Sequence, residues 1–301
     1  MAGPRILVCD PIHENGVKLL KEAGYIVDLR TSCTASELVE AIGDFDAIVV
    51  RNRTKVTEQV LEAGKRLKAV ARAGVGLDNI DLNAAEQRGV VVVNSPEAPS
   101  NAVAELVLGL MLSLARRIPE ADDSMKKGKW IKKRLTGIEL KGKTLGIIGF
   151  GRIGFQLAKK AGALEMRVLT ARRARGGEAG ADAVDLDELL GSSDFVTVHV
   201  PLLPQTKHMI GTEEIRTMKD GAYLINAARG GVVDEEALRK ALVSGKLAGA
   251  ALDVYEEEPP RDITLVGLQN VVSLPHIGAA TVEAQRASST VVAEKLIEIL
   301  G

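Results

Sequence analysis

The sequence predicts an α/β protein built from two doubly wound parallel-sheet domains with a cleft between them. Short apolar runs alternate with helical patterns along the chain, and this alternation implies parallel strands joined by crossover helices. The alternation stops at one long helical stretch and then starts again, which divides the chain in two. The length of 301 residues also suits about two domains.

The first half of the chain contains strand and helix patterns in strict alternation. Five short apolar runs predict strands at 6–9, 25–29, 47–50, 69–71 and 90–93. The segments between them predict helices at 15–23, 36–42, 58–63 and 82–87. Two cysteines, Cys9 and Cys33, cannot form a disulfide framework or a four-ligand metal site, so we expect both to be buried as small apolar side chains.

The second half begins with a helical stretch over 101–125, which we expect to break near Pro119. A basic segment follows at 126–134. Six further apolar runs predict strands at 145–148, 167–170, 195–199, 223–226, 248–252 and 271–274. Their continuous apolar character is typical of strands that are buried on both faces. A last helix is expected over 280–300 and has no strand after it, so it should pack back on the first domain.

This pattern predicts a discontinuous first domain. Residues 1–98 and 274–301 form a flavodoxin-like unit, and residues 99–273 form a Rossmann domain.

Composition and charge exclude several classes of protein. Hydrophobic residues make up 46% of the chain, which is enough for a sizeable core. The net charge is −1, so the global basic field of a nucleic-acid-binding protein is absent. The apolar run at 106–115 is about half the length that crosses a bilayer. We therefore expect a cytoplasmic protein with no metal, nucleic-acid or membrane partner.

A glycine motif predicts a dinucleotide site. Gly149, Gly151 and Gly154 form a G-x-G-x-x-G pattern directly after an expected strand and open an expected helix. The first glycine permits a tight turn, the second lets the backbone approach a pyrophosphate, and the third lets helix and strand pack closely. The phosphates would meet free amides at the positive end of the helix dipole.

The end of the next strand bears on the choice of cofactor. NAD sites usually place an acidic residue about 20 residues after the glycines. Here Arg172 and Arg173 stand at that place, and no acid follows until Glu178. Because a guanidinium grips a phosphate and an acid repels it, we expect NADP(H) to be used at least as well as NAD(H). A solvated basic loop, with the ribose held by backbone alone, is the alternative.

Histidine is the usual proton donor near neutral pH, and the chain has four histidines. His276 follows a strand end, where open α/β sheets place their ligands. His199 also ends a strand, so the pattern alone leaves the choice between the two open. His13 and His208 are expected to be surface or capping residues.

The ordered set of motifs resembles the D-isomer-specific 2-hydroxyacid dehydrogenase family, and within it the D-3-phosphoglycerate dehydrogenases. The matching segments cover nearly the full length: 72–81, 149–154, 226–231, 252–260 and 275–281. The resemblance implies that His276 transfers the proton and that Glu258 pairs with it and favours imidazolium. It implies that Arg229 binds the substrate carboxylate.

The resemblance also assigns residues to cofactor and substrate. For the cofactor, the implied contacts are the amides of Arg152 and Ile153 at the pyrophosphate, Val200 and Pro201 at the adenine, Asp253 at the nicotinamide carboxamide, and further contacts from Ala227, Ala228, His276, Gly278 and Ala279. The backbone at Val75 and Gly76 should cradle the carboxylate. The cations at Arg51, Arg53 and Lys55 suit a phosphate, and Arg72 completes the substrate set.

The implied reaction moves a hydride between a nicotinamide and 3-phosphoglycerate or 3-phosphohydroxypyruvate, on the route to serine. Residues 1–98 with 274–301 would then bind substrate, and residues 99–273 the dinucleotide. The alternatives are an NADPH-dependent glyoxylate or hydroxypyruvate reductase and, more remotely, a non-catalytic NAD(H)-sensing protein. The family further suggests a homodimer through the 101–125 stretch and the Trp130 region. The sequence stops at Gly301, so we expect no serine-binding regulatory domain.

Overall fold

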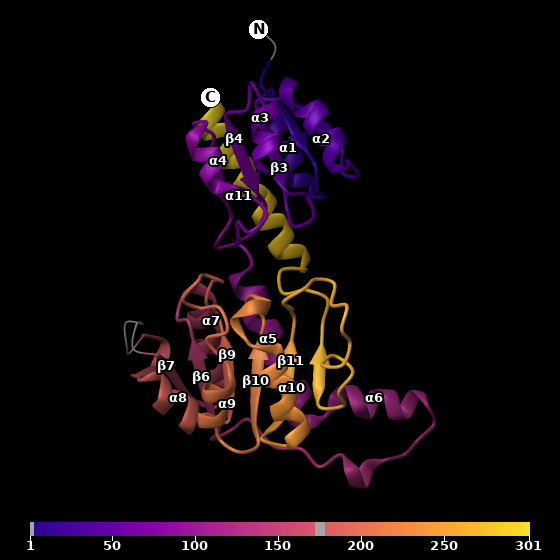
Figure 1. The fold of residues 1–301 in the computed structure, drawn as a ribbon, viewed down its shortest axis with the longest axis vertical. Helices are drawn as coiled ribbons and strands as arrows, with labels where there is room; N and C mark the ends of the chain where they lie inside the picture. Colours follow the sequence, from indigo (N-terminus) through magenta and orange to yellow (C-terminus); the bar gives the residue numbers. More distant parts are fainter. Residues whose placement is uncertain (1–2, 172–177) are drawn as a thin grey trace. The chain divides into compact units, whose positions relative to one another are not determined.

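The computed structural model describes residues 3–171 and 178–301. The chain divides into two compact units, which are described separately below. Unit 1 comprises Met1–Pro99 together with Ala279–Gly301, and unit 2 comprises Ser100–Gly278. Each unit is built on one parallel sheet with helices on both faces (Figure 1), so the predicted fold class is confirmed.

Unit 1 is built on a five-stranded sheet with the order β2-β1-β3-β4-β5. Its strands are β1 (Arg5–Val8), β2 (Ile26–Leu29), β3 (Ala47–Val50), β4 (Ala69–Arg72) and β5 (Val91–Asn94). Its helices are α1 (Glu14–Glu22), α2 (Ala35–Ala41), α3 (Glu58–Ala63), α4 (Leu82–Gln87) and α11 (Val282–Leu300). This order is the flavodoxin-like doubly wound arrangement.

Alternation along the strands of unit 1 builds two apolar layers. Ile6 and Val8 face one side, where Leu20 of α1 and Leu296 of α11 cover them. The other face packs against residues of α2, α3 and α4. Helix α11 therefore belongs to the core of unit 1, although it is separated from the rest of that unit by the whole of unit 2.

Unit 2 is built on a seven-stranded sheet with the order β12-β11-β10-β9-β6-β7-β8. Its strands are β6 (Thr144–Ile148), β7 (Arg167–Ala171), β8 (Ala181–Val184), β9 (Phe195–Val198), β10 (Ala222–Asn226), β11 (Leu247–Leu252) and β12 (Val271–Ser273). Its helices are α5 (Ser100–Arg116), α6 (Ile118–Lys126), α7 (Arg152–Ala163), α8 (Leu186–Ser192), α9 (Thr212–Thr217) and α10 (Glu235–Ser244). The order is that of a dinucleotide-binding sheet with an added edge strand.

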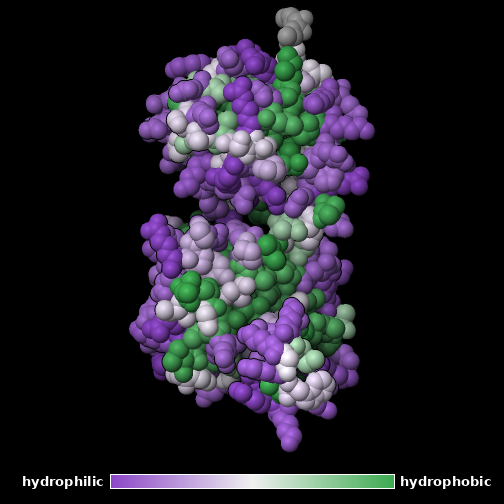
Figure 2. Space-filling model, turned by 90° about the vertical axis from the view of Figure 1, so that its right-hand side faces the viewer, coloured by the Kyte–Doolittle hydropathy of each residue, from purple (hydrophilic) through white to green (hydrophobic). Residues whose placement is uncertain are grey.

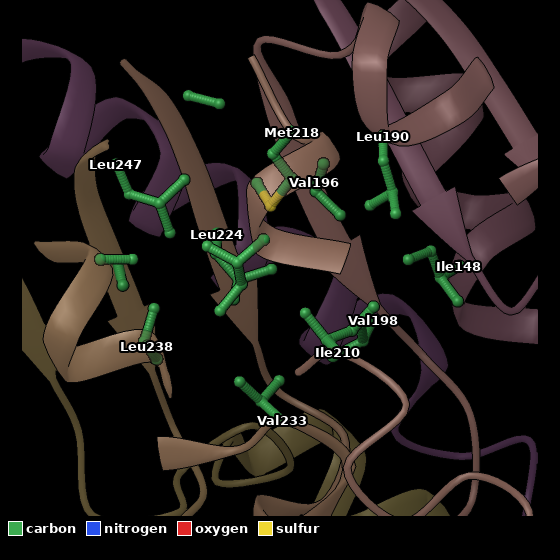
Figure 3. Close-up of a cluster of buried hydrophobic side chains, with 14 of the residues drawn as sticks. Ile148, Leu190, Val196, Val198, Ile210, Met218, Leu224, Val233, Leu238 and Leu247 are labelled. Atoms are coloured by element: carbon green, nitrogen blue, oxygen red, sulfur yellow. The ribbon is translucent and has the colours of Figure 1, made fainter. Parts of the chain in front are cut away.

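Two apolar clusters fix this sheet between its helices. Figure 3 shows one of them, in which Val196 and Leu224 of the sheet pack with Leu190 and Leu238 of α8 and α10. The other cluster joins the opposite face to α5 and α7. Because every strand is parallel to its neighbours, the loops at the carboxyl ends of the strands share one edge of the sheet, where the functional residues lie.

Two expectations need correction. Strand β8 was not predicted, because its two middle residues, Asp182 and Ala183, are exposed on an edge strand and leave no continuous apolar run. The helical stretch breaks near Pro119, as expected: the break is at Arg117, which has a left-handed backbone (φ 52°), and Pro119 lies in the first turn of α6, where proline costs no hydrogen bond. Cys9 is buried, but Cys33 is partly exposed, since it lies in the turn before α2.

None of the helices in the described part of the chain is long and apolar enough to cross a membrane.

Candidate active site

The glycine loop of unit 2 is shaped by close backbone packing. Gly149 has a φ of +99°, and a methyl group there would lie 2.5 Å from the carbonyl oxygen of His199. A methyl group at Gly154 would lie 2.6 Å from the carbonyl oxygen of Gly149. Both positions therefore require glycine for the turn itself, as the motif predicts.

Gly151 differs from these two glycines. A methyl group there would meet no protein atom within 4 Å, so packing does not explain the glycine. The residue is exposed and precedes α7, whose N-terminus has no side-chain cap. Open space in front of uncapped amides at the end of a twelve-residue helix fits a dinucleotide pyrophosphate.

A pair of alanine substitutions in α7 and its loop separates binding from folding. We expect Gly151→Ala to leave the unfolding midpoint unchanged but to weaken dinucleotide binding by about 10-fold or more, because the methyl group pushes the phosphate from its amide donors. Gly162→Ala is the matched control, since a methyl group there also meets nothing within 4 Å. Cofactor fluorescence titration measures both; equal affinity for Gly151→Ala and the parent would contradict this reading of the loop.

The loops after β11 and β12 bring a histidine and a carboxylate together. Nδ1 of His276 lies 2.7 Å from Oε2 of Glu258. The other oxygen of Glu258 accepts a hydrogen bond from the backbone N–H of Tyr255 at 3.2 Å. Both side chains remain partly exposed, at 42% and 38%. With Nδ1 turned to the carboxylate, Nε2 is the ring nitrogen left to exchange a proton with a substrate.

The charge state of Glu258 suits this pairing. Burial raises the pKa of Glu258, but the hydrogen bond and charge of His276, the N–H of Tyr255 and the charge of Arg229 together hold that pKa below its ordinary value. The carboxylate is therefore ionised near neutral pH.

Asp253 fixes the backbone of the histidine loop. His276 has a left-handed backbone (φ 54°), which a non-glycine residue adopts only when its surroundings hold it there. The two carboxylate oxygens of Asp253 accept the N–H groups of Ile277 and Gly278, each at 2.7 Å. Burial raises the pKa of Asp253, which is 1% exposed. Its contact with a nicotinamide stays a prediction, whereas its clamp on this loop is directly observed.

Arg229 follows β10 at the same edge of the sheet. Its Nη1 donates to the carbonyl oxygen of Ala228 at 2.7 Å, and Asn226 fixes the turn through the carbonyl of Arg229 and the N–H of Ala228. The next residue, Gly230, packs so closely on the peptide joining Tyr255 and Glu256 that a methyl group would overlap the carbonyl group of Tyr255. The loop of Arg229 and the loop of Glu258 are thus in direct contact.

The other three histidines have different partners. Burial lowers the pKa of His199 to about 4, and its Nε2 lies 3.1 Å from the hydroxyl of Thr197. His13 caps α1, as expected. His208 is an exposed residue, as expected, and its Nε2 lies 3.0 Å from Oε1 of Glu256. Two histidines therefore have a glutamate partner on the loop after β11, and His276, which follows β12, is the one that pairs with Glu258 as the resemblance implied.

The other residues predicted to contact the cofactor lie in loops that directly follow strands. Val200 and Pro201 follow β9, and Ala227 and Ala228 follow β10. Arg172 and Arg173 lie outside the described residues.

In unit 1 the predicted substrate residues follow β3 and β4, and a buried aspartate organises them. The carboxylate of Asp10 accepts hydrogen bonds from the N–H of Arg51 at 2.6 Å and from the N–H and hydroxyl of Thr54. It also forms an ion pair with Arg53 at 3.3 Å. Arg53 also donates to the carbonyl oxygen of Cys9, and Nε of Arg72 donates to that of Arg51 at 2.8 Å. Two of the three predicted arginines therefore help to hold the loop that presents Arg51.

The backbone of Val75 and Gly76 follows the same strand end as Arg72, and the side chain of Asn94 donates to the carbonyl oxygen of Val75 at 2.5 Å. Arg51 itself lines a small cleft of unit 1 with Pro11, Ala73, Gln285 and Ser288. Sequence reasoning missed Asp10 and Asn79, whose amide donates to the carbonyl oxygen of Thr54. Asp10 comes two residues after β1, and Asn79 lies within the 72–81 segment that carries the resemblance.

Comparison with known proteins agrees with these observations. The model of the D-isomer specific 2-hydroxyacid dehydrogenase NAD binding domain matches residues 108–278. D-3-phosphoglycerate dehydrogenase of Methanocaldococcus jannaschii is 50% identical over 98% of this chain, and the chain spans 57% of that relative. Hydroxypyruvate reductase of Thermotoga maritima is 47% identical over the whole of both chains.

Solved structures agree as well. The TT0316 protein of Thermus thermophilus superposes with a TM-score of 0.92 at 36% identity, covering 98% of this chain and 96% of its own. A glyoxylate reductase from Paecilomyes thermophila superposes with a TM-score of 0.89 at 32% identity, covering 98% of this chain and 95% of its own. The fold of unit 2 and its glycine loop are those of the dinucleotide-binding α/β proteins. The chain belongs to the D-isomer-specific 2-hydroxyacid dehydrogenase family, as the resemblance implied.

Proposed function

We propose that the protein is an NAD(P)-dependent D-2-hydroxyacid dehydrogenase that interconverts 3-phosphoglycerate and 3-phosphohydroxypyruvate, on the route to serine. The observation that carries the proposal is the 2.7 Å pairing of His276 with Glu258 at the edge of the sheet that also carries the glycine loop. Half of the aligned residues are shared with a D-3-phosphoglycerate dehydrogenase, which supports this choice of substrate.

The chemistry divides between three side chains. In reduction, Nε2 of His276 donates a proton to the oxygen of the forming alcohol, and in oxidation it takes that proton back. Glu258 holds the ring through Nδ1 and stabilises the imidazolium. Arg229 binds the substrate carboxylate through its forked donors and so orients the carbonyl carbon. A bound nicotinamide supplies the hydride or accepts it.

We place substrate binding in unit 1, on Arg51, Arg53, Arg72 and the backbone of Val75 and Gly76. Arg51 is the residue we expect to meet the phosphate, because it lines a cleft of this unit. The bonds that Arg53 makes to Asp10 and Cys9 support a role for Arg53 in holding the loop. We place dinucleotide binding in unit 2.

A second candidate activity is reduction of hydroxypyruvate. It is favoured by the hydroxypyruvate reductase that matches this chain from end to end at 47% identity. Assays of the purified protein with phosphohydroxypyruvate, hydroxypyruvate and glyoxylate, with each reduced cofactor, decide between the two. Phosphohydroxypyruvate should give the highest kcat/KM; a higher value with hydroxypyruvate would transfer the proposal to the second activity, and no turnover with any of them would reject both.

For the cofactor we propose that NADP(H) is used at least as well as NAD(H). The support comes from the sequence. Arg172 and Arg173 stand where NAD sites usually have an acidic residue, and such a residue would repel a 2′-phosphate. We expect Arg172→Asp to shift the NADP/NAD ratio of kcat/KM toward NAD by about 10-fold or more, because a charge-assisted hydrogen bond is replaced by repulsion. Initial rates with both cofactors measure the ratio, and an unchanged ratio would remove the argument.

For assembly we propose a homodimer through α5, α6 and the segment that follows them. Hydrophobic residues form a band across the surface of unit 2 in Figure 2. Several large side chains of these elements are exposed, namely Leu112 (42%), Ile118 (49%), Met125 (56%) and Trp130 (77%). Exposed apolar side chains gathered in one region favour association. A cytoplasmic location stays a prediction.

A further inference from the structure

A second histidine–glutamate pair lies beside the first, and the glutamates of both pairs belong to the loop after β11. Nε2 of His208 lies 3.0 Å from Oε1 of Glu256, two residues before Glu258. His208 follows β9, whereas Glu256 follows β11. Like His276, His208 has a left-handed backbone, with a φ of 51°. Strained residues of this kind persist where surrounding contacts hold them and often mark functional sites.

Glu256 is also tied to the start of α10. Its N–H donates to Oε1 of Glu235 at 2.7 Å, and the N–H of Glu235 donates to Oε1 of Glu256 at 3.3 Å. The two glutamates thus exchange backbone hydrogen bonds in both directions. Three chain segments, from the carboxyl ends of three strands, converge on one carboxylate.

These contacts reach the site on both sides. The N–H of His208 donates to the carbonyl oxygen of Gly231 at 2.8 Å, which ties it to the loop of Arg229. Gly230 packs against the peptide that joins Tyr255 to Glu256. The N–H of that tyrosine donates to Glu258 at 3.2 Å. A shift of Glu256 therefore displaces both the carboxylate that holds His276 and the turn that presents Arg229.

The cluster carries an electrostatic cost at Glu235. Burial raises the pKa of Glu235, a hydrogen bond from Glu256 lowers it, and the negative charges of Glu256, Asp262 and Glu258 raise it further. Negative charges that lie close together repel one another, so the ionised form of Glu235 is held here at a cost. An apolar loop would avoid this cost, but it would not define the direction in which Glu258 points.

We propose that His208, Glu256 and Glu235 are positioning residues for the reaction, and that they hold the loop of Tyr255 to Glu258 so that Glu258 meets Nδ1 of His276 and Arg229 faces the substrate carboxylate. The inference rests on the proposed function and deepens it. The three residues act through Glu258 and Arg229. Their loss should lower kcat more than it weakens cofactor binding, because a misplacement of about 1 Å at a reacting group costs about 100-fold in rate.

The test compares three variants of the full chain. His208→Ala removes the ring, Glu256→Gln removes the charge, and His208→Gln keeps an amide that can donate to Glu256. We expect His208→Ala and Glu256→Gln to lower kcat by about 10-fold to 100-fold with the affinity for the reduced cofactor unchanged, and His208→Gln to recover most of the rate. Glu213→Gln is the control, since it breaks an exposed pair with Arg216 on α9 and should change nothing.

A second readout does not depend on turnover. The Nδ1–H proton of His276 should give a downfield NMR resonance, which is assigned by its absence in His276→Asn. We expect this resonance to move or disappear in His208→Ala and to return in His208→Gln. An unchanged resonance, a parental kcat in His208→Ala, or a loss that His208→Gln does not restore would overturn the proposal. A parent protein that reduces none of the keto acids would instead reject the proposed function, and the resonance would still report on the network.

Discussion

Replacing His276 with asparagine should lower kcat by about 10²-fold to 10⁴-fold, which is the usual range for losing a general acid–base group. Asparagine is the informative choice, because it tolerates the left-handed backbone of this position (φ 54°) better than most residues. The clamp of Asp253 on the N–H groups of Ile277 and Gly278 is a contact with backbone and should survive the change. The loss then reports on proton transfer rather than on a collapsed loop.

The measurement is steady-state reduction of the keto acid, with cofactor affinity determined separately by fluorescence. Glu258→Gln serves as the graded companion: an amide still contacts Nδ1 of His276 but no longer supplies a negative charge, so its kcat should fall between the parent and His276→Asn. A His276→Asn enzyme that turns over at the parental rate would remove the histidine from the mechanism.

Replacing Arg229 with glutamine should lower kcat/KM by about 10²-fold to 10³-fold, equivalent to about 3–4 kcal/mol. A guanidinium binds a carboxylate through two parallel charged hydrogen bonds, and an amide keeps neither the charge nor the fork. Most of the loss should appear in KM for the keto acid. The affinity for the dinucleotide should change little, because Arg229 is proposed to bind the substrate.

Arg229→Lys separates charge from geometry. It keeps the positive charge without the planar fork, so its kcat/KM should lie between those of the parent and the glutamine variant. Arg216→Gln, on the exposed surface of α9, is the control for losing an arginine from unit 2. Equal KM values for Arg229→Gln and the parent would show that the carboxylate is bound elsewhere.

Most of the fold is predictable because its signals are local. Buried parallel strands read as apolar runs, and the glycine loop has fixed spacing between a strand and a helix. The exception is β8, an edge strand of four residues with polar and small residues in its middle. The break of the long helix falls near Pro119, as predicted, but its position at Arg117 depends on a left-handed backbone that leaves no signal in the sequence.

The site was predictable to the extent that its residues follow strand ends. Position placed His276 as a candidate, and the family resemblance supplied Glu258 and Arg229. Hydrogen bonds between distant segments leave no such trace. Glu256 contacts Glu235, which lies 21 positions away in the sequence, and His208, which lies 48 positions away. Asp10 and Arg51 lie 41 positions apart. A single aspartate or glutamate in a loop has many ordinary explanations until its partners are seen.

The place of α11 in unit 1 has a consequence for biosynthesis. Val292 and Leu296 close the apolar layer over Ile6 and Val8, and Gly16 of α1 lies against the backbone of Ser289. A ribosome delivers these residues only after all of unit 2. Unit 2 can therefore complete its core during translation, whereas the first 99 residues must wait with one face of their sheet covered by α1 alone.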